Sequence, residues 1–169
     1  MNKHSWHLVE GYRPGILGTC VRMHAEFYAR HAGFGAFFEA QVATGMADFV
    51  QRLDRPLNEI WTAFAGDRML GCVALDGEDL GRSTAHLRWF IVDDGCRGAG
   101  VGKALLASAL QFADTRAFDE VELWTFAGLD AARRLYERSG FNLVKESTGS
   151  QWGVAVREQH FVRICPRKK

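Results

Sequence analysis

The sequence lacks the charge imbalance, the cysteine pairs and the long apolar runs that mark several classes of protein. Its formal net charge is +1 and its isoelectric point about 7.7, so no broad electrostatic field favours nucleic acid. The 4 cysteines are far apart and form no C-x-x-C pair, which indicates free thiols rather than a zinc site or a disulfide framework. No segment approaches membrane-spanning length. We therefore expect no metal, nucleic-acid or membrane partner.

The two ends of the chain carry no targeting signal that we recognise. Met1–Val9 is polar, without the apolar core of a signal peptide, and Arg167-Lys168-Lys169 is interpreted as a short solvated tail. We expect a cytoplasmic protein. With 169 residues, 47% of them hydrophobic, the chain can bury one sizeable core, and no repeat, linker or low-complexity segment divides it. The sequence predicts a single domain over residues 1–169.

Apolar periodicity and turn residues predict alternating strands and helices. Helices are expected over Ile16–His31, Ala36–Leu53, Gly100–Arg116 and Leu129–Ser139. Strands are expected over His4–Arg13, Glu59–Ala65, Met69–Leu75, Ala85–Val92, Phe118–Phe126, Phe141–Glu146 and Val154–Ile164. This order favours an α/β fold with a mixed sheet and helices on both faces.

A glycine-rich segment, Arg97-Gly98-Ala99-Gly100-Val101-Gly102-Lys103, lies between an apolar strand and an apolar-periodic helix. The first N–H groups of a helix lack carbonyl partners, and the helix dipole adds partial positive charge there. Phosphate is the natural occupant, and the glycines allow its close approach. The nucleoside-triphosphate P-loop is excluded because Arg97 replaces its first glycine and Ala104 follows Lys103. The dinucleotide fingerprint G-x-G-x-x-G does not match, because only one residue, Val101, separates Gly100 from Gly102. A glycine-rich turn without a ligand is the alternative.

A second block, Asp130–Phe141, reads as a helix that ends at a glycine before a new strand. Ala131, Ala132, Leu135 and Tyr136 share one face of this helix. The two blocks, R-x-x-G-x-G and A-x-x-L-Y-x-x-x-G-F, are separated by one strand. In this order they make the chain similar to the GCN5-related N-acetyltransferase (GNAT) family, including members fused to MarR-type regulators, over essentially its whole length.

The resemblance implies the acyl-CoA N-acyltransferase fold, with a mixed, mostly antiparallel sheet of about seven strands. It implies acetyl-CoA as the cofactor, with its pyrophosphate at Arg97–Lys103 and with Ala132 and Tyr136 contributing from the second block. A bulge around Phe90, Ile91 and Val92 would turn a backbone N–H toward the thioester carbonyl. Tyr136, a phenol that stays protonated at neutral pH, is expected to protonate the departing thiolate. The alternative is a core aromatic.

A general base is expected on the strand Ala85–Val92. Alternation places His86, Arg88, Phe90 and Val92 on one face. The ordinary pKa of histidine suits proton abstraction from an ammonium, directly or through water, so His86 is the candidate. Arylalkylamine N-acetyltransferases have a histidine at its position, although Arg88 replaces a second histidine of theirs. A structural His86 is the alternative, with rival carboxylates at Glu59, Glu78, Glu122 and Glu158.

Aromatic residues are expected to surround the acceptor. Phe34 and Phe38 lie at the helix junction that forms one wall of the family's acceptor cleft, and Trp124, Trp152 and Arg88 complete the predicted substrate contacts. Core packing is the alternative for each aromatic. We expect a small apolar or cationic primary amine, acetylated by direct attack in a ternary complex. The alternatives are a coenzyme A-binding sensor domain and acetylation of a protein lysine or N-terminus. Dimerisation through the C-terminal strands stays open.

Overall fold

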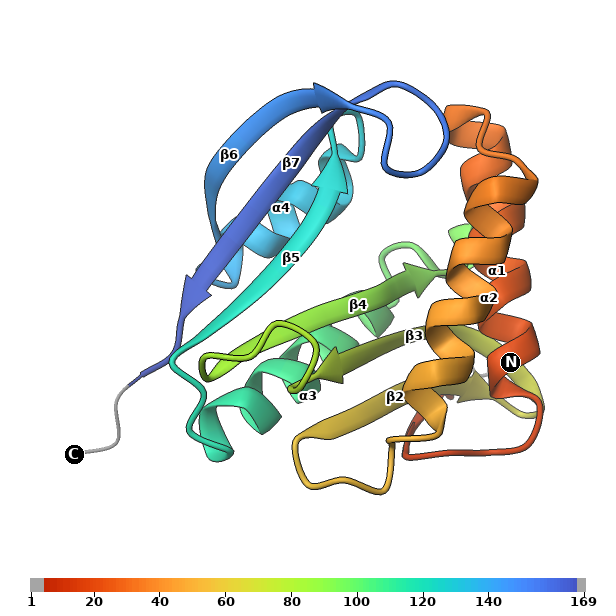
Figure 1. Cartoon of the computed structure of the whole chain (residues 1–169). Helices are drawn as coiled ribbons and strands as arrows, with labels where there is room; N and C mark the ends of the chain where they lie inside the picture. The colour runs from red at the N-terminus through yellow and green to blue at the C-terminus, as the bar shows by residue number, and fades with distance from the viewer. Residues whose placement is uncertain (1–4, 167–169) are drawn as a thin grey trace.

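The computed structural model describes residues 5–166, so His4 of the predicted first strand and the predicted tail at residues 167–169 lie outside the described part. Within it the chain forms seven strands and four α-helices (Figure 1). The helices are α1 (Ile16–Ala32), α2 (Ala36–Val50), α3 (Val101–Thr115) and α4 (Asp130–Arg138). The strands are β1 (His7–Glu10), β2 (Asn58–Ala65), β3 (Arg68–Asp76), β4 (Thr84–Val92), β5 (Glu120–Phe126), β6 (Asn142–Gly149) and β7 (Val156–Ile164).

All seven strands belong to one sheet, in the order β1-β2-β3-β4-β5-β7-β6. Every neighbouring pair is antiparallel except β4 and β5, which are parallel. Helices α1 and α2 cover one face and α3 and α4 the other, each pair over its own apolar cluster (Figure 1). The predicted fold class, a mixed and mostly antiparallel sheet with helices on both faces, is confirmed. Among residues 5–166, no helix is long and apolar enough to span a membrane.

The apolar faces of the first two helices explain why they pack on the sheet. In α2, the predicted stripe Phe38, Val42, Met46 and Phe49 is buried. In α1, the fully buried line runs through Ile16, Cys20 and His24, while the predicted Met23 and Phe27 are only half-buried. The polar His24 thus occupies a position on the inward face of α1.

Strands β4 and β5 pair over a short distance and then separate. Only three residue pairs join them, from Thr84 opposite Glu120 to His86 opposite Glu122. Beyond this seam β4 runs toward α1 and α2, whereas β5 turns toward β6 and β7 (Figure 1). The space between the separating strands opens into the cleft described below.

A β-bulge interrupts β4 just beyond the seam. Cys72 of β3 lies opposite Ile91 and Ala74 lies opposite Arg88, so the single residue between them on β3 faces Trp89 and Phe90. Trp89 has a φ of 48°, a left-handed value that is unusual for a large side chain and fits the bulge.

The bulge corrects one sequence prediction. Phe90 and Val92 pack against the cluster beneath α3, together with Ala85 and Leu87, whereas Trp89 and Ile91 join the cluster beneath α1 and α2. Because one extra residue resets the alternation, His86 and Arg88 do not share a face with Phe90 and Val92. The prediction that these four residues lie on one face is therefore wrong.

Candidate active site

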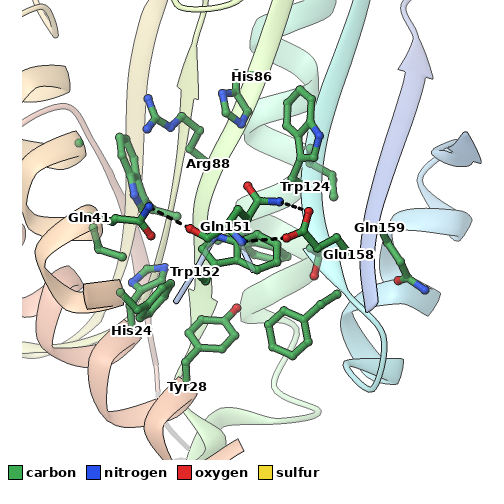
Figure 2. A pocket seen from close by; sticks show the side chains of 18 of the residues that line it. His24, Tyr28, Gln41, His86, Arg88, Trp124, Gln151, Trp152, Glu158 and Gln159 are labelled. Atoms are coloured by element: carbon green, nitrogen blue, oxygen red, sulfur yellow. Dashed lines mark hydrogen bonds between the residues drawn. The ribbon is translucent and has the colours of Figure 1, made fainter. Parts of the chain in front are cut away.

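The gap between β4 and β5 opens into a cleft of about 920 Å³ (Figure 2). Eight of the residues proposed from the sequence line it: Phe34, Phe38, His86, Arg88, Phe90, Trp124, Tyr136 and Trp152. The other proposed cofactor contacts, namely Ile91, Val92, Ala132 and Arg97–Lys103, lie outside this lining. The residues proposed from the sequence thus fall into two groups, one that lines the cleft and one outside it that includes the glycine loop.

The glycine loop meets the cleft through Phe90. A Cβ built on Gly102, in the first turn of α3, would lie 3.6 Å from the Phe90 ring and 3.4 Å from Val92. The third side chain in contact, Leu135 at 3.6 Å, comes from α4. The first turn of α3 thus packs directly behind the cleft wall.

The backbone of the loop forms an open cradle. Gly98 and Gly100 have φ angles of 80° and 79°, and a Cβ on either would meet nothing within 4 Å. Helix α3 has no side-chain N-cap, and its first helical hydrogen bond runs from the Ala104 N–H to the Gly100 carbonyl. The three preceding amides therefore have no carbonyl one turn back. Free amides, a helix dipole and open space together fit a phosphate group.

The two basic residues of the loop differ in their availability. The Arg97 guanidinium donates to the Asp94 carboxylate at 2.7 Å, so part of its charge is already offset. Lys103 makes no ion pair within residues 5–166. The loop thus offers an anion its amides and Lys103 more than it offers Arg97.

Tyr136 is a core aromatic residue that also lines the cleft. It is 6% exposed, and its ring packs among Phe90, Phe141 and Phe161. Its hydroxyl has no hydrogen-bond partner in residues 5–166, yet no fully buried side-chain polar atom there lacks one. The hydroxyl must therefore reach the cleft that Tyr136 lines. Burial, with a smaller contribution from Tyr28, raises the pKa of Tyr136 above the ordinary value, so the phenol holds its proton.

His86 is paired with a carboxylate that the sequence did not point to. Its Nδ1 lies 2.6 Å from Asp79 Oδ2. Because an ionised carboxylate only accepts hydrogen bonds, Nδ1 carries a proton, and in the neutral imidazole Nε2 then presents a lone pair. The imidazole also packs edge-on against Trp124, with ring centroids 4.9 Å apart. Asp79 lies in the acidic turn before β4, and no spacing rule connects such a turn to a strand histidine.

Arg88 is held at the same end of the cleft as His86 (Figure 2). Its guanidinium stacks over Trp89 at 4.0 Å and lies 3.3 Å from Asp76 and 3.5 Å from Asp79. These contacts are at the long end of the hydrogen-bonding range, so much of the donor capacity of Arg88 remains for a ligand.

The rival carboxylates are mostly placed elsewhere. Glu78 is engaged by Arg52, Arg55 and Asn58, and neither it nor Glu59 lines the cleft. Glu122 accepts from His160 Nε2 at 2.6 Å, behind the lining. Glu158 does line the cleft, but the Gln151 backbone and side chain both donate to it at 2.9 Å.

The loop between β6 and β7 roofs the cleft. The Gln41 side chain of α2 donates to the Gln151 carbonyl at 2.9 Å, and Gln151 in turn is tied to Glu158 on β7 (Figure 2). Trp152 stacks on Phe34 with a centroid distance of 6.1 Å. Trp152 thus lies in the lining of the cleft, and Phe34 serves both as core and as cleft wall.

Comparisons with known proteins identify relatives of this chain. Residues 21–141 match the acetyltransferase (GNAT) family. The chain is 30% identical over 128 residues to N-acetylaspartate synthetase of Danio rerio, covering 75% of this chain and 45% of that protein. It is 28% identical over 139 residues to N-acetyltransferase 8 of Homo sapiens, covering 79% of this chain and 61% of that protein. The chain thus spans only about half the length of these curated relatives.

A solved structure shows the same fold. The crystal structure of ribosomal-protein-alanine N-acetyltransferase from Brucella melitensis superposes with a TM-score of 0.74 over 94% of this chain and 99% of that one, at 16% identity. Sequence and fold lead to one conclusion: the chain belongs to the acetyltransferase (GNAT) family.

Proposed function

We propose that the protein is an acetyl-CoA-dependent N-acetyltransferase that acts on a primary amine of a small molecule. The observation that carries this proposal is the junction at Phe90, where an open anion cradle adjoins a cleft that contains Tyr136 and His86. A carrier with a diphosphate and a thioester arm needs both places at once. Family membership supports the same activity.

The glycine cradle would hold the carrier and orient its thioester. The amides of Val101–Lys103 and the Lys103 ammonium would bind the diphosphate. When bound, the carrier supplies an activated acetyl carbon. The bulge at Trp89 and Phe90 interrupts the β3–β4 ladder, and we place the backbone donor for the developing oxyanion there, beside the predicted Phe90–Val92. Holding both reactants in register can lower the barrier by several kcal/mol, up to about 7–11 in favourable cases.

Two side chains would carry the protons. The amine nitrogen attacks the carbonyl carbon, and its proton passes to His86 Nε2, directly or through water. The C–S bond then breaks, and the Tyr136 hydroxyl gives its proton to the sulfur. Asp79 acts as a positioning residue, because its bond to Nδ1 keeps the His86 lone pair directed away from the carboxylate. General acid–base groups of this kind contribute about 10²–10⁴-fold in rate.

The shape of the cleft favours a small acceptor over a protein. The Gln41–Gln151 hydrogen bond and the Trp152–Phe34 stack join the β6–β7 loop to the α1–α2 side of the cleft, which supports a small acceptor over a peptide that needs an open groove. A relative's name, N-acetylaspartate synthetase, also denotes a small acetylated amine.

Two measurements in sequence test the proposed function. Calorimetry with acetyl-CoA should show binding that Gly100→Asp abolishes, because a carboxylate would then stand in the cradle. Thiol release should then be measured with polyamines, arylalkylamines, amino acids, aminoglycosides and peptides. Release with at least one small amine is expected, and Tyr136→Phe should suppress it. Tight acetyl-CoA binding without release from any of these amines would instead identify a sensor domain.

A further inference from the structure

Helix α1 directs two polar groups into the cleft that the proposed mechanism does not use. His24 and Tyr28 are four residues apart, and both line the cleft on the side opposite to His86 and Arg88 in Figure 2. Residues at this spacing lie on one helical face. Their rings stack with centroids 6.2 Å apart.

The hydrogen bonding of His24 fixes which ring nitrogen faces the cleft. Its Nδ1 lies 2.7 Å from the Cys20 carbonyl, which only accepts, so Nδ1 carries the proton. Nε2 then presents a lone pair and has no donor in residues 5–166. His24 is only 4% exposed, and no fully buried side-chain polar atom of the described chain lacks a partner. Nε2 must therefore open into the cleft, where it is an acceptor without a donor.

Burial keeps both groups uncharged. It lowers the pKa of His24 to about 4, against a smaller opposing effect of the Cys20 hydrogen bond, so the imidazole is neutral at physiological pH. Burial raises the pKa of Tyr28 to about 12, so the phenol is neutral as well. Tyr28 makes no hydrogen bond in residues 5–166, and its hydroxyl points toward the interior of the cleft (Figure 2).

Aromatic rings surround these groups. Tyr28 packs against Phe34, Phe38 and Phe126, with centroid distances of 5.7, 5.2 and 5.7 Å. The one carboxylate in the lining, Glu158, already accepts two hydrogen bonds from Gln151. An amine entering beside His24 would find a neutral acceptor and π faces. The burial of this part of the cleft favours the neutral, nucleophilic form of an amine over the ammonium.

We propose that His24 and Tyr28 bind the acceptor's amine group, with His24 Nε2 accepting a hydrogen bond from an N–H of an amine borne on an apolar or aromatic body. The inference rests on the proposed function, because it assigns the amine end of that reaction's substrate. His24 acts here as a specificity-determining residue: it takes no proton, which remains the task of His86. Quaternary amines, which have no N–H, are excluded as ligands of Nε2.

Two variants separate the acceptor role of His24 from its structural role. His24→Asn can keep a donor near the Cys20 carbonyl but removes the acceptor at Nε2. His24→Gln reaches far enough to return an acceptor oxygen to that place. For the amine that gives the fastest thiol release, His24→Asn should raise KM about tenfold, the effect of one lost hydrogen bond, and His24→Gln should restore most of it. The Kd of acetyl-CoA should not change in either variant.

Nuclear magnetic resonance of the histidine ring nitrogens gives a readout that does not need turnover. With coenzyme A bound, 2-phenylethylamine, n-butylamine and L-aspartate are titrated in turn, and phenylethyltrimethylammonium is the control. We expect the primary amine with the aromatic body to shift His24 Nε2 and the quaternary analogue to leave it unmoved. If none of the three amines shifts Nε2, or if the quaternary cation shifts it equally, the assignment of His24 is overturned. A failure of acetyl-CoA to bind would overturn the proposed function instead.

Discussion

Replacing Arg52 with methionine is expected to lower the free energy of unfolding by about 3 kcal/mol. Asp76, at the end of β3, is fully buried and accepts hydrogen bonds from the two Arg52 amino groups at 3.0 and 2.7 Å. Removing one partner of a buried ion pair typically costs about 3–5 kcal/mol. The lower end applies, because the Glu78 amide at 3.1 Å and Arg88 at 3.3 Å would still contact the carboxylate. For a chain of this size the melting temperature should fall by about 6–12 °C.

Urea unfolding followed by tryptophan fluorescence measures this loss. Burial by itself would raise the pKa of Asp76, but Arg52, the Glu78 amide and Arg88 together bring it below the ordinary value. A carboxylate with a lowered pKa in the folded state contributes stability that is complete above its unfolded pKa, about 3.9, and is lost as the pH falls through the folded pKa. The difference between wild type and Arg52→Met should therefore be full at pH 7 and shrink below about pH 4.

The double variant Arg52→Met/Asp76→Leu is the matched control. It removes both charges and leaves no buried carboxylate without a partner, so it should recover most of the lost stability. The reasoning is refuted if Arg52→Met loses less than about 1 kcal/mol at pH 7, or if the double variant is as unstable as the sum of the two single variants.

Three further substitutions test the site. Tyr136→Phe should lower kcat by about 10²-fold or more with the Kd of acetyl-CoA unchanged, and full activity would remove Tyr136 from the acid role. Asp79→Asn should lower kcat more than it raises KM, and Asp79→Glu should recover part of the loss. If Asp79→Asn is as active as Asp79→Glu, Asp79 is not a positioning residue for His86. Gly100→Ala should weaken acetyl-CoA binding severalfold in calorimetry, since it strains a φ of 79°, whereas Gly18→Ala, in the first turn of α1 with open space around it, should not.

The order of the elements could be predicted because each carries its own local signal, although β1 ends at Glu10 and α2 at Val50, each three residues before its predicted end. The stripe Phe38–Phe49 fixed the inward face of α2, and the glycine turn before Val101 located the start of α3 within a residue. Hydrophobic period and turn chemistry are local properties, and the packing of this sheet agrees with them.

The contacts of the site depended on features that no local pattern contains. The bulge at Trp89 shifts Phe90 and Val92 to the other face, and it arises from the pairing of β4 with β3. Asp79 contacts His86 because a turn folds back on the strand, and the spacing of the two residues in the sequence does not predict this contact. His24 had a signal that was overlooked: it continues the Ile16–Cys20 line on the buried face of α1, where a histidine needs a partner.

Because the seam between β4 and β5 is short, the two walls of the cleft are held together by contacts at its two ends. At the narrow end, three residue pairs from Thr84 to His86 are all that joins β4 to β5 within the described residues. At the wide end, one hydrogen bond from Gln41 to Gln151 and the Trp152–Phe34 stack join the β6–β7 loop to α2 and to the α1–α2 junction. A change at Gln41, whose side chain makes that hydrogen bond, therefore alters which acceptors fit without touching the groups that do the chemistry.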